Sequence, residues 1–209
     1  MPLLLAITLH EAGHGYAASM LGDQTARAHG RLTLNPTAHI DPFGTVVMPG
    51  LLMLMNAGFL FGYAKPVPVD ARNLRRPRRD MVLVALAGPG MNVALALVAA
   101  LALPLALVLP DAVAPWTLAN LDNLIKISLL LAVFNMLPLP PLDGGRVMVG
   151  LLPYAQARAL ARVEPFGIFI VLGLFIVLPL ATQGRIDLFG TLILQPTLFL
   201  YNALLGIYG

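Results

Sequence analysis

The sequence predicts an all-α membrane protein that crosses the bilayer several times. Of its 209 residues, 58% are apolar and only 11% are charged, and the mean hydropathy is +0.83. A soluble domain of this size carries about 25% charged residues. Several apolar runs approach the roughly 20 residues that a helix needs to cross the hydrocarbon core. We therefore expect five transmembrane helices, one re-entrant segment and short extended stretches on the cytoplasmic side.

The expected elements can be placed along the chain from the apolar runs and their breaks. The five predicted spans are residues 2–21, 81–109, 117–137, 164–182 and 186–205. The run 43–63 is also apolar, but Pro49-Gly50 interrupts its centre. The start of the basic stretch 65–80 reads as extended, because each proline removes a donor and disfavours helix before it. Proline and glycine in 138–145 break the helix of the third span, 117–137, and 154–163 has the composition of a short amphipathic helix.

The first span contains the most informative motif, His10-Glu11-Ala12-Gly13-His14. Two histidines four residues apart lie about one turn apart on one helix face, so both imidazoles can reach one metal ion. The pattern His-Glu-x-x-His is typical of zinc hydrolases, with the glutamate as general base. Ionisable residues inside an apolar run are costly in lipid and indicate a functional site. The alternative is a chance match, with histidines that are merely hydrogen-bonded.

A third metal ligand is needed, because catalytic zinc usually takes three protein ligands and one water. The sequence has no cysteine, so this ligand is an oxygen or nitrogen group. Asp143 is the leading candidate, since it follows a proline-broken helix and precedes Gly144-Gly145. Irregular backbone at membrane depth is tolerated where it is buried or lines a cavity. The same residues also suit an ordinary aqueous turn, and on these residues alone both readings stay open.

The proposed ligands constrain the topology. If every apolar run spanned the membrane, His14 and Asp143 would lie near opposite faces, too far apart for metal bonds of about 2 Å. The conflict disappears if residues 43–63 dip into the membrane and return, packed against protein. Eleven of the thirteen Lys and Arg residues, all but Lys126 and Arg185, then fall on one side. The positive-inside tendency makes that side cytoplasmic.

Three separated motifs carry a resemblance to a known family. They are His10 to His14, then Ala87-Gly88-Pro89-Gly90-Met91-Asn92, then Asn135-Met136-Leu137-Pro138-Leu139-Pro140-Pro141-Leu142-Asp143-Gly144. Residues 30–42 and 62–69 add to the match. With these motifs, the chain resembles the site-2 protease family of intramembrane zinc metalloproteases, in its compact prokaryotic branch.

The resemblance implies one Zn²⁺ held by His10, His14 and Asp143, with Glu11 activating the attacking water. It also implies that Asn135 and Asn92 position the substrate or the oxyanion. The implied substrates are transmembrane helices of other proteins, cut in or near the bilayer, as in regulated intramembrane proteolysis. The implied location is a prokaryotic inner or plasma membrane, multi-pass, with the active site nearer the cytoplasm.

The domain organisation is expected to be simple, one membrane-embedded domain over residues 1–209 with a core at about 2–146 and C-terminal helices at 147–209. Many family members have a further helix before the His-Glu-x-x-His span, whereas nine residues precede His10 here. We see no inserted PDZ-like domain and no room for a terminal CBS-like domain. The oligomeric state is not indicated by the sequence.

Other functional classes are weighed against the protease. A membrane metal transporter or metal-binding protein also needs intramembrane His and Asp, but a base next to its ligand suits hydrolysis better. A catalytically silent helix-binding module is the third reading. The formal charge of +3 and pI near 9.6 do not indicate nucleic acid, because the basic residues cluster beside apolar spans and fit lipid headgroups. His29 and His39 are assigned ordinary loop roles. Arg146 is left open between orienting Asp143 and facing headgroups.

Overall fold

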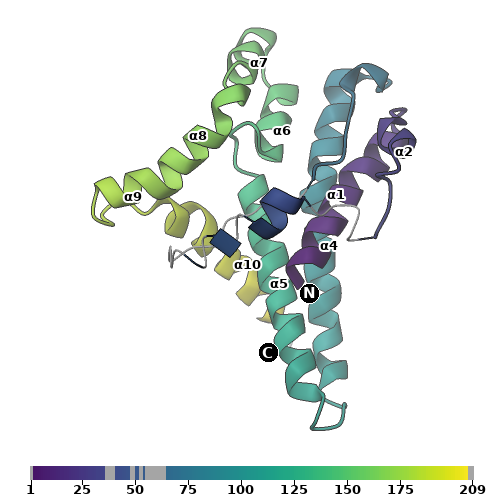
Figure 1. Ribbon diagram of the computed structural model, residues 1–209, viewed down its shortest axis with the longest axis vertical. Coiled ribbons are helices and arrows are strands. Elements are labelled where there is room, and N and C mark those ends of the chain that lie inside the picture. Colours follow the sequence, from purple (N-terminus) through teal and green to yellow (C-terminus); the bar gives the residue numbers. More distant parts are fainter. Residues whose placement is uncertain (1, 36–40, 48–49, 52–53, 55–64, 207–209) are drawn as a thin grey trace.

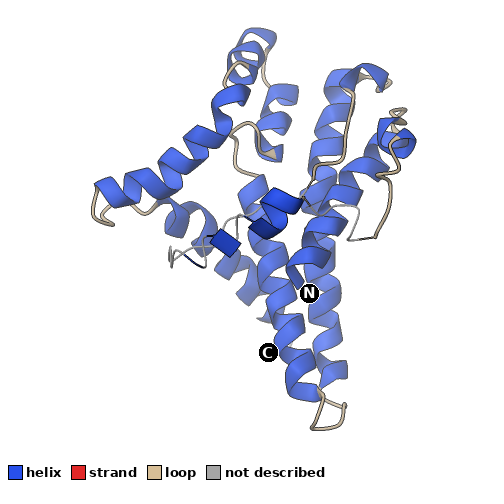
Figure 2. Ribbon diagram, viewed as in Figure 1, coloured by secondary structure: helices blue, strands red, loops and turns tan. Residues whose placement is uncertain are grey.

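The computed structural model describes residues 2–35, 41–47, 50–51, 54 and 65–206. The described residues form helices and connecting loops, with no strand among them (Figure 2). The main helices are α1 (Pro2–Met20), α4 (Pro77–Ala106), α5 (Ala114–Asn135), α6 (Asp143–Leu151) and α10 (Gln195–Leu205). The predicted all-α class therefore holds for the part of the chain that the structure describes.

The shorter helices complete the chain (Figure 1). They are α2 (Thr25–Ala28), α7 (Tyr154–Ala161), α8 (Gly167–Leu172) and α9 (Leu178–Ala181). Single 3₁₀ turns cover Ala71–Asn73 and Glu164–Phe166, and π-helical turns cover Pro42–Val47, Gly173–Val177 and Gly190–Leu194.

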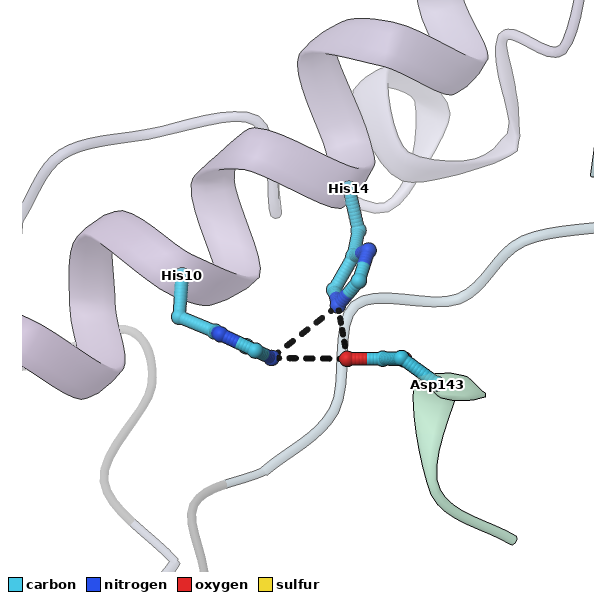
Figure 3. A group of neighbouring side chains, drawn as sticks. All are labelled: His10, His14 and Asp143. Carbon is cyan, nitrogen blue, oxygen red and sulfur yellow. Dashed lines mark hydrogen bonds and ion pairs between the residues drawn. The ribbon is translucent and has the colours of Figure 1, made fainter. Parts of the chain in front are cut away.

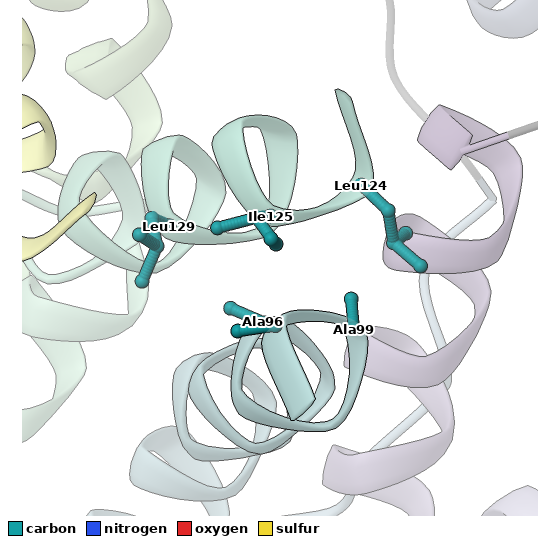
Figure 4. Close-up of a cluster of buried hydrophobic side chains, with 6 residues drawn as sticks. Ala96, Ala99, Leu124, Ile125 and Leu129 are labelled. Carbon is teal, nitrogen blue, oxygen red and sulfur yellow. The ribbon is translucent and has the colours of Figure 1, made fainter. Parts of the chain in front are cut away.

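The centre of the fold is the antiparallel pair of α4 and α5. Small side chains on α4, Ala96 and Ala99 among them, face Leu124, Ile125 and Leu129 of α5 (Figure 4). Small residues let two helix backbones approach closely, which is how helices gain packing energy in lipid, where no hydrophobic effect draws them together. This pair forms the frame against which the other elements of the site are placed.

Helix α1 packs against α4 at a glycine contact. A Cβ atom built on Gly13 would lie 2.8 Å from the carbonyl oxygen of Ala87. Only a residue without a side chain permits this approach, and it brings the His-Glu-x-x-His face of α1 onto the Ala87–Asn92 part of α4. Two of the three sequence motifs are therefore in direct contact.

Three helical stretches are long and apolar enough to cross a membrane, namely Pro77–Ala106, Ala114–Asn135 and Tyr154–Ala181. Gly190–Leu205 is apolar but shorter, with 16 residues, about 24 Å at 1.5 Å per residue. The predicted amphipathic helix 154–163 and span 164–182 are joined in one 28-residue stretch. The structure thus supports a membrane protein with three candidate spans, and the count of five stays a prediction.

The chain leaves and re-enters the bundle at the same end. The backbone N–H of Arg75 donates to the carbonyl of Leu21 at 3.1 Å, and the N–H of Asp70 donates to Asp23 Oδ2 at 2.7 Å. The end of α1 and the start of α4 therefore lie together, as a re-entrant connection requires. Most of residues 43–63 fall outside the described residues, so their course stays a prediction.

Candidate metal centre

Three predicted ligands from two distant parts of the chain converge on one point (Figure 3). His10 and His14 project from α1, one turn apart, and Asp143 opens α6. The two Nε2 atoms lie 3.1 Å apart, and Asp143 Oδ2 is 3.1 Å from His10 Nε2 and 3.2 Å from His14 Nε2. Zinc bonds of about 2.0–2.1 Å with tetrahedral angles place two ligand atoms about 3.3 Å apart. The donor spacing therefore matches a single tetrahedral ion.

The outer nitrogen of each histidine is engaged, which directs the inner nitrogen at the shared point. His14 Nδ1 lies 2.7 Å from the carbonyl oxygen of Val84, which only accepts, so Nδ1 carries the proton. His10 Nδ1 lies 3.1 Å from the side-chain amide of Asn92. With the amide turned so that its oxygen faces the ring, Asn92 Oδ1 accepts a hydrogen bond from His10 Nδ1–H, and this tautomer leaves His10 Nε2 for a metal. Such partners orient metal-binding histidines in proteins.

The electrostatics of this arrangement call for a cation. With both Nδ1 atoms protonated, two Nε2 lone pairs and one carboxylate oxygen face each other within 3.2 Å. All three residues are buried, with 5–7% of their surface exposed, and Asp143 Oδ2 has no hydrogen-bond donor among the described residues. Buried unpaired charge is strongly unfavourable. Two neutral imidazoles and one carboxylate are a ligand set that suits Zn²⁺.

Gly88 of α4 supplies the space for the two imidazoles. A Cβ atom at this position would overlap His14 Nε2 and would lie 2.8 Å from His10 Nε2. The Gly88-Pro89 motif therefore has a direct steric role at the site, and the sequence alone did not reveal it.

Asp143 is held at the start of α6 by close backbone packing. A Cβ atom on Gly144 would overlap the backbone of Met136, and one on Gly145 would overlap that of Pro140. The proline-rich loop can therefore fold tightly against the first turn of α6. The irregular segment expected after the span 117–137 is thus a partly buried loop, packed against the buried start of α6, that presents the carboxylate of Asp143.

Glu11 lies beside this centre in the wall of a cavity of about 470 Å³. The cavity is also lined by the three ligands, Pro66 and Asn135. Glu11 Oε2 accepts a hydrogen bond from the backbone N–H of Val67 at 2.8 Å, and no hydrogen bond from another described residue occupies Oε1, which can accept a proton. A general base therefore faces the same space as the three donor atoms.

The two predicted asparagines occupy different positions. Asn135 lines the cavity, and its Nδ2 donates to the carbonyl of Leu131 at 2.9 Å. Asn92 is fully buried behind His10 and does not line the cavity. Arg146, left open between two roles, lies at the cavity rim with its Nη2 3.8 Å from Glu164 Oε1.

One further group near the site was not expected from the sequence. Asp23, with no exposed surface, accepts from the N–H of Asp70 and from Asn73 Nδ2. Burial alone would raise the pKa of Asp23, but hydrogen bonds from Thr25, Asp70 and Asn73 outweigh it and hold the pKa below its ordinary value. This carboxylate fixes the segment that carries Val67 to the end of α1. The sequence signal that could have indicated this role is an acidic residue directly after an apolar run.

The remaining histidines do not join the centre among the described residues. His29 is exposed, and its Nδ1 lies 2.9 Å from the carbonyl of Thr25. His39 lies outside the described residues.

Comparison with known proteins agrees with this geometry. Residues 104–178, which include Asp143, match Peptidase family M50. The chain is 39% identical over 198 residues to the putative zinc metalloprotease YwhC of Bacillus subtilis, covering 88% of this chain and 85% of YwhC. The chain belongs to peptidase family M50, the site-2 protease family. The predicted family, enzyme class and zinc dependence are therefore confirmed.

Two further relatives of this site-2 protease are the putative zinc metalloproteases Rip2 of Mycobacterium tuberculosis and Mycolicibacterium smegmatis. Each is 34% identical, over 173 and 175 residues, and each alignment covers 83% of this chain. The chain spans 64% of the length of these two relatives. No solved structure matches the chain.

Proposed function

We propose that this protein is an intramembrane site-2 protease in which His10, His14 and Asp143 hold one Zn²⁺ and Glu11 is the general base. The observation that carries the proposal is the convergence of three buried donor atoms within 3.2 Å beside a free carboxylate oxygen. A structural zinc site would be closed by a fourth protein ligand. Here the three donors border the cavity, which supports a catalytic site.

The chemistry follows from the positions of these residues. Bound zinc supplies an electrophile that polarises the scissile carbonyl and lowers the pKa of water. Glu11 Oε1 accepts a proton from the attacking water and returns it to the leaving amide nitrogen. The Val67 N–H holds Oε2, so the carboxylate keeps one orientation through both transfers. Asn135 in the cavity wall positions the substrate backbone or the developing oxyanion. Asn92 acts on His10, by fixing the tautomer that leaves Nε2 for the metal.

The substrates are transmembrane helices that unwind locally before cleavage. A helix in lipid has its backbone groups bonded internally, so its carbonyls are not accessible to a catalyst. The cavity of about 470 Å³ admits a few residues of extended chain and not an intact helix, whose diameter is about 10 Å. Cleavage therefore follows unwinding at or near the membrane, as in regulated intramembrane proteolysis.

We further propose a multi-pass protein of the cell membrane with five spans, a re-entrant segment at 43–63 and the site nearer the cytoplasm. The return of the chain to one end of the bundle supports this arrangement. The clustering of eleven basic residues on one side supports the orientation. A cysteine-accessibility scan is expected to label residues 23–41 and 70–80 from the same side. Labelling from opposite sides would refute the topology.

The activity is tested by reconstituting the protein with a transmembrane peptide and comparing wild type with Glu11→Gln. We expect Glu11→Gln to retain zinc and to lose cleavage by about 10²–10⁴-fold, the usual contribution of a general base. Glu164→Gln is the matched control, because it removes a carboxylate at the rim of the same cavity. Equal loss in both variants, or metal transport across the bilayer by wild type and Glu11→Gln alike, would refute the protease.

A further inference from the structure

A second cavity, of about 510 Å³, lies between the start of α4 and the end of α6. Arg78 and Arg79 of α4 line one part of it, and Val82 and Leu83 line the next turn of the same helix. Leu151, at the end of α6, lies on the opposite wall. None of its lining residues belongs to the catalytic cavity. We call it the α4–α6 groove.

The two arginines at this groove carry uncompensated charge. Both are exposed, and neither guanidinium has an ion pair or hydrogen bond with another described residue. Asp80, the acidic residue of the same helical turn, is buried, and its Oδ2 accepts from the backbone N–H of Arg76 at 2.7 Å. The Asp80 carboxylate therefore forms no ion pair with Arg78 or Arg79, and the groove presents two positive charges.

The apolar part of the groove follows the charged part along the axis of α4. Val82 comes four residues after Arg78, and Leu83 four after Arg79, about 6 Å further along the helix. Leu83 and Leu151 are 46% and 68% exposed. Leaving this much apolar surface of two leucines in contact with water is unfavourable in free energy. Because α4 is a candidate span, the charged end lies toward the headgroups and the apolar end toward the hydrocarbon.

We infer that the α4–α6 groove binds one anionic phospholipid. The two guanidiniums hold the phosphate, for which arginine has matching donor geometry. The first part of an acyl chain covers Val82, Leu83 and Leu151. A zwitterionic lipid leaves the positive charge uncompensated, and a soluble phosphate leaves the leucines exposed. The order of charge and apolar surface along α4 therefore selects a lipid whose headgroup is negative.

The test is lipid titration of the purified full-length protein in detergent, followed by native mass spectrometry. The probes are phosphatidylglycerol, phosphatidylcholine and glycerol 3-phosphate. We expect one phosphatidylglycerol to bind at least tenfold more tightly than either of the others. The double variant Arg78→Gln/Arg79→Gln should weaken this binding about thirtyfold, since each basic residue near the membrane surface contributes a factor of about five. Leu151→Asn should weaken lipid binding and leave glycerol 3-phosphate unaffected.

Arg75→Gln/Arg76→Gln is the matched control, because it removes the same charge from exposed neighbours outside the groove. We expect this variant to bind phosphatidylglycerol within threefold of wild type. Equal weakening by both double variants would overturn the site in favour of general surface charge. Equal binding of phosphatidylglycerol and phosphatidylcholine, or of phosphatidylglycerol and glycerol 3-phosphate, would also overturn it. Thermal unfolding of each variant excludes misfolding, and Leu151→Asn tests the apolar wall without a charge change.

Discussion

Val67 donates its backbone N–H to Glu11 Oε2 at 2.8 Å, joining the helix of the two histidines to an extended segment 56 residues away. Pro66 and Pro68 have no backbone N–H, so Val67 supplies the one backbone hydrogen-bond donor of this three-residue stretch. Gly15 permits the approach, because a Cβ there would lie 3.1 Å from Val67 Cγ1. The Pro-Val-Pro stretch thus presents a single amide to the proposed base.

Removing this donor tests whether Val67 positions Glu11. We expect Val67→Pro to lower kcat at least tenfold with little change in KM, because the carboxylate loses its fixed orientation and substrate binding is retained. Cleavage of a reconstituted transmembrane peptide gives both constants, and zinc content should stay at wild-type level.

Two variants separate the hydrogen bond from its surroundings. Val67→Ala keeps the N–H, and Val69→Pro adds a proline two residues on, where the N–H bonds no described residue. Both should lose far less of kcat than Val67→Pro. If Val67→Pro instead raises KM and spares kcat, the stretch is an edge that pairs with substrate, and the positioning role is wrong.

Asn92 is expected to act on zinc affinity and not on the substrate. Asn92→Ala removes the partner of His10 Nδ1, and loss of such partners typically weakens metal affinity 10–100-fold. Competition with a zinc chelator measures the change. Asn135→Ala is the comparison, because it lines the cavity and should lower cleavage with unchanged zinc affinity. Unchanged zinc affinity in Asn92→Ala would contradict the role.

Gly88 is expected to be intolerant of even one methyl group. Gly88→Ala places a Cβ against both imidazoles, so the donor atoms cannot keep their 3.1–3.2 Å spacing. We expect loss of bound zinc and of cleavage. Gly90→Ala, two residues along the same helix, adds a Cβ that meets no atom within 4 Å. This variant should be more stable than wild type by up to about 1 kcal/mol, because alanine has the higher helix propensity. Equal zinc content in both variants would show that the steric argument fails.

Asp23 should make stability depend on acid pH. Its pKa is lower in the folded protein than in the unfolded chain, so its contribution is complete above the unfolded value near 3.9 and is lost as pH falls through the folded value. Asp23→Ala leaves the Asp70 N–H without its acceptor and should cost about 1–3 kcal/mol at neutral pH. Urea unfolding at pH 7 and pH 3 is expected to show a smaller pH difference in the variant. An equal difference in both proteins would refute the assignment.

The sequence predicted the parts of the site that depend on local spacing. His10 and His14 share a helix face because four residues make about one turn. Asp143 followed from a helix break and from the family motif, not from spacing, since its approach to α1 depends on the fold of the intervening 128 residues. The full number of spans did not follow, because hydropathy marks α4 and α5 clearly but marks the polar-containing α1 and the short Gly190–Leu205 less well.

The supporting contacts could not be predicted, because each joins groups that only the tertiary fold brings together. The carbonyl of Val84 and the amide of Asn92 meet the histidines across the α1–α4 interface. A backbone N–H such as that of Val67 leaves no sequence signal beyond the flanking prolines. The use of Gly88 as space for two rings is likewise visible only once both helices are placed.

The central claim is that residues 133 positions apart hold one zinc, and metal content tests it most directly. Purified wild type, Glu11→Gln, His10→Ala, His14→Ala and Asp143→Ala are compared by mass spectrometry of the metal after brief chelator treatment. We predict one zinc per chain in wild type and in Glu11→Gln, and loss of zinc in each of the other three. One zinc retained by Asp143→Ala with wild-type affinity would contradict the account.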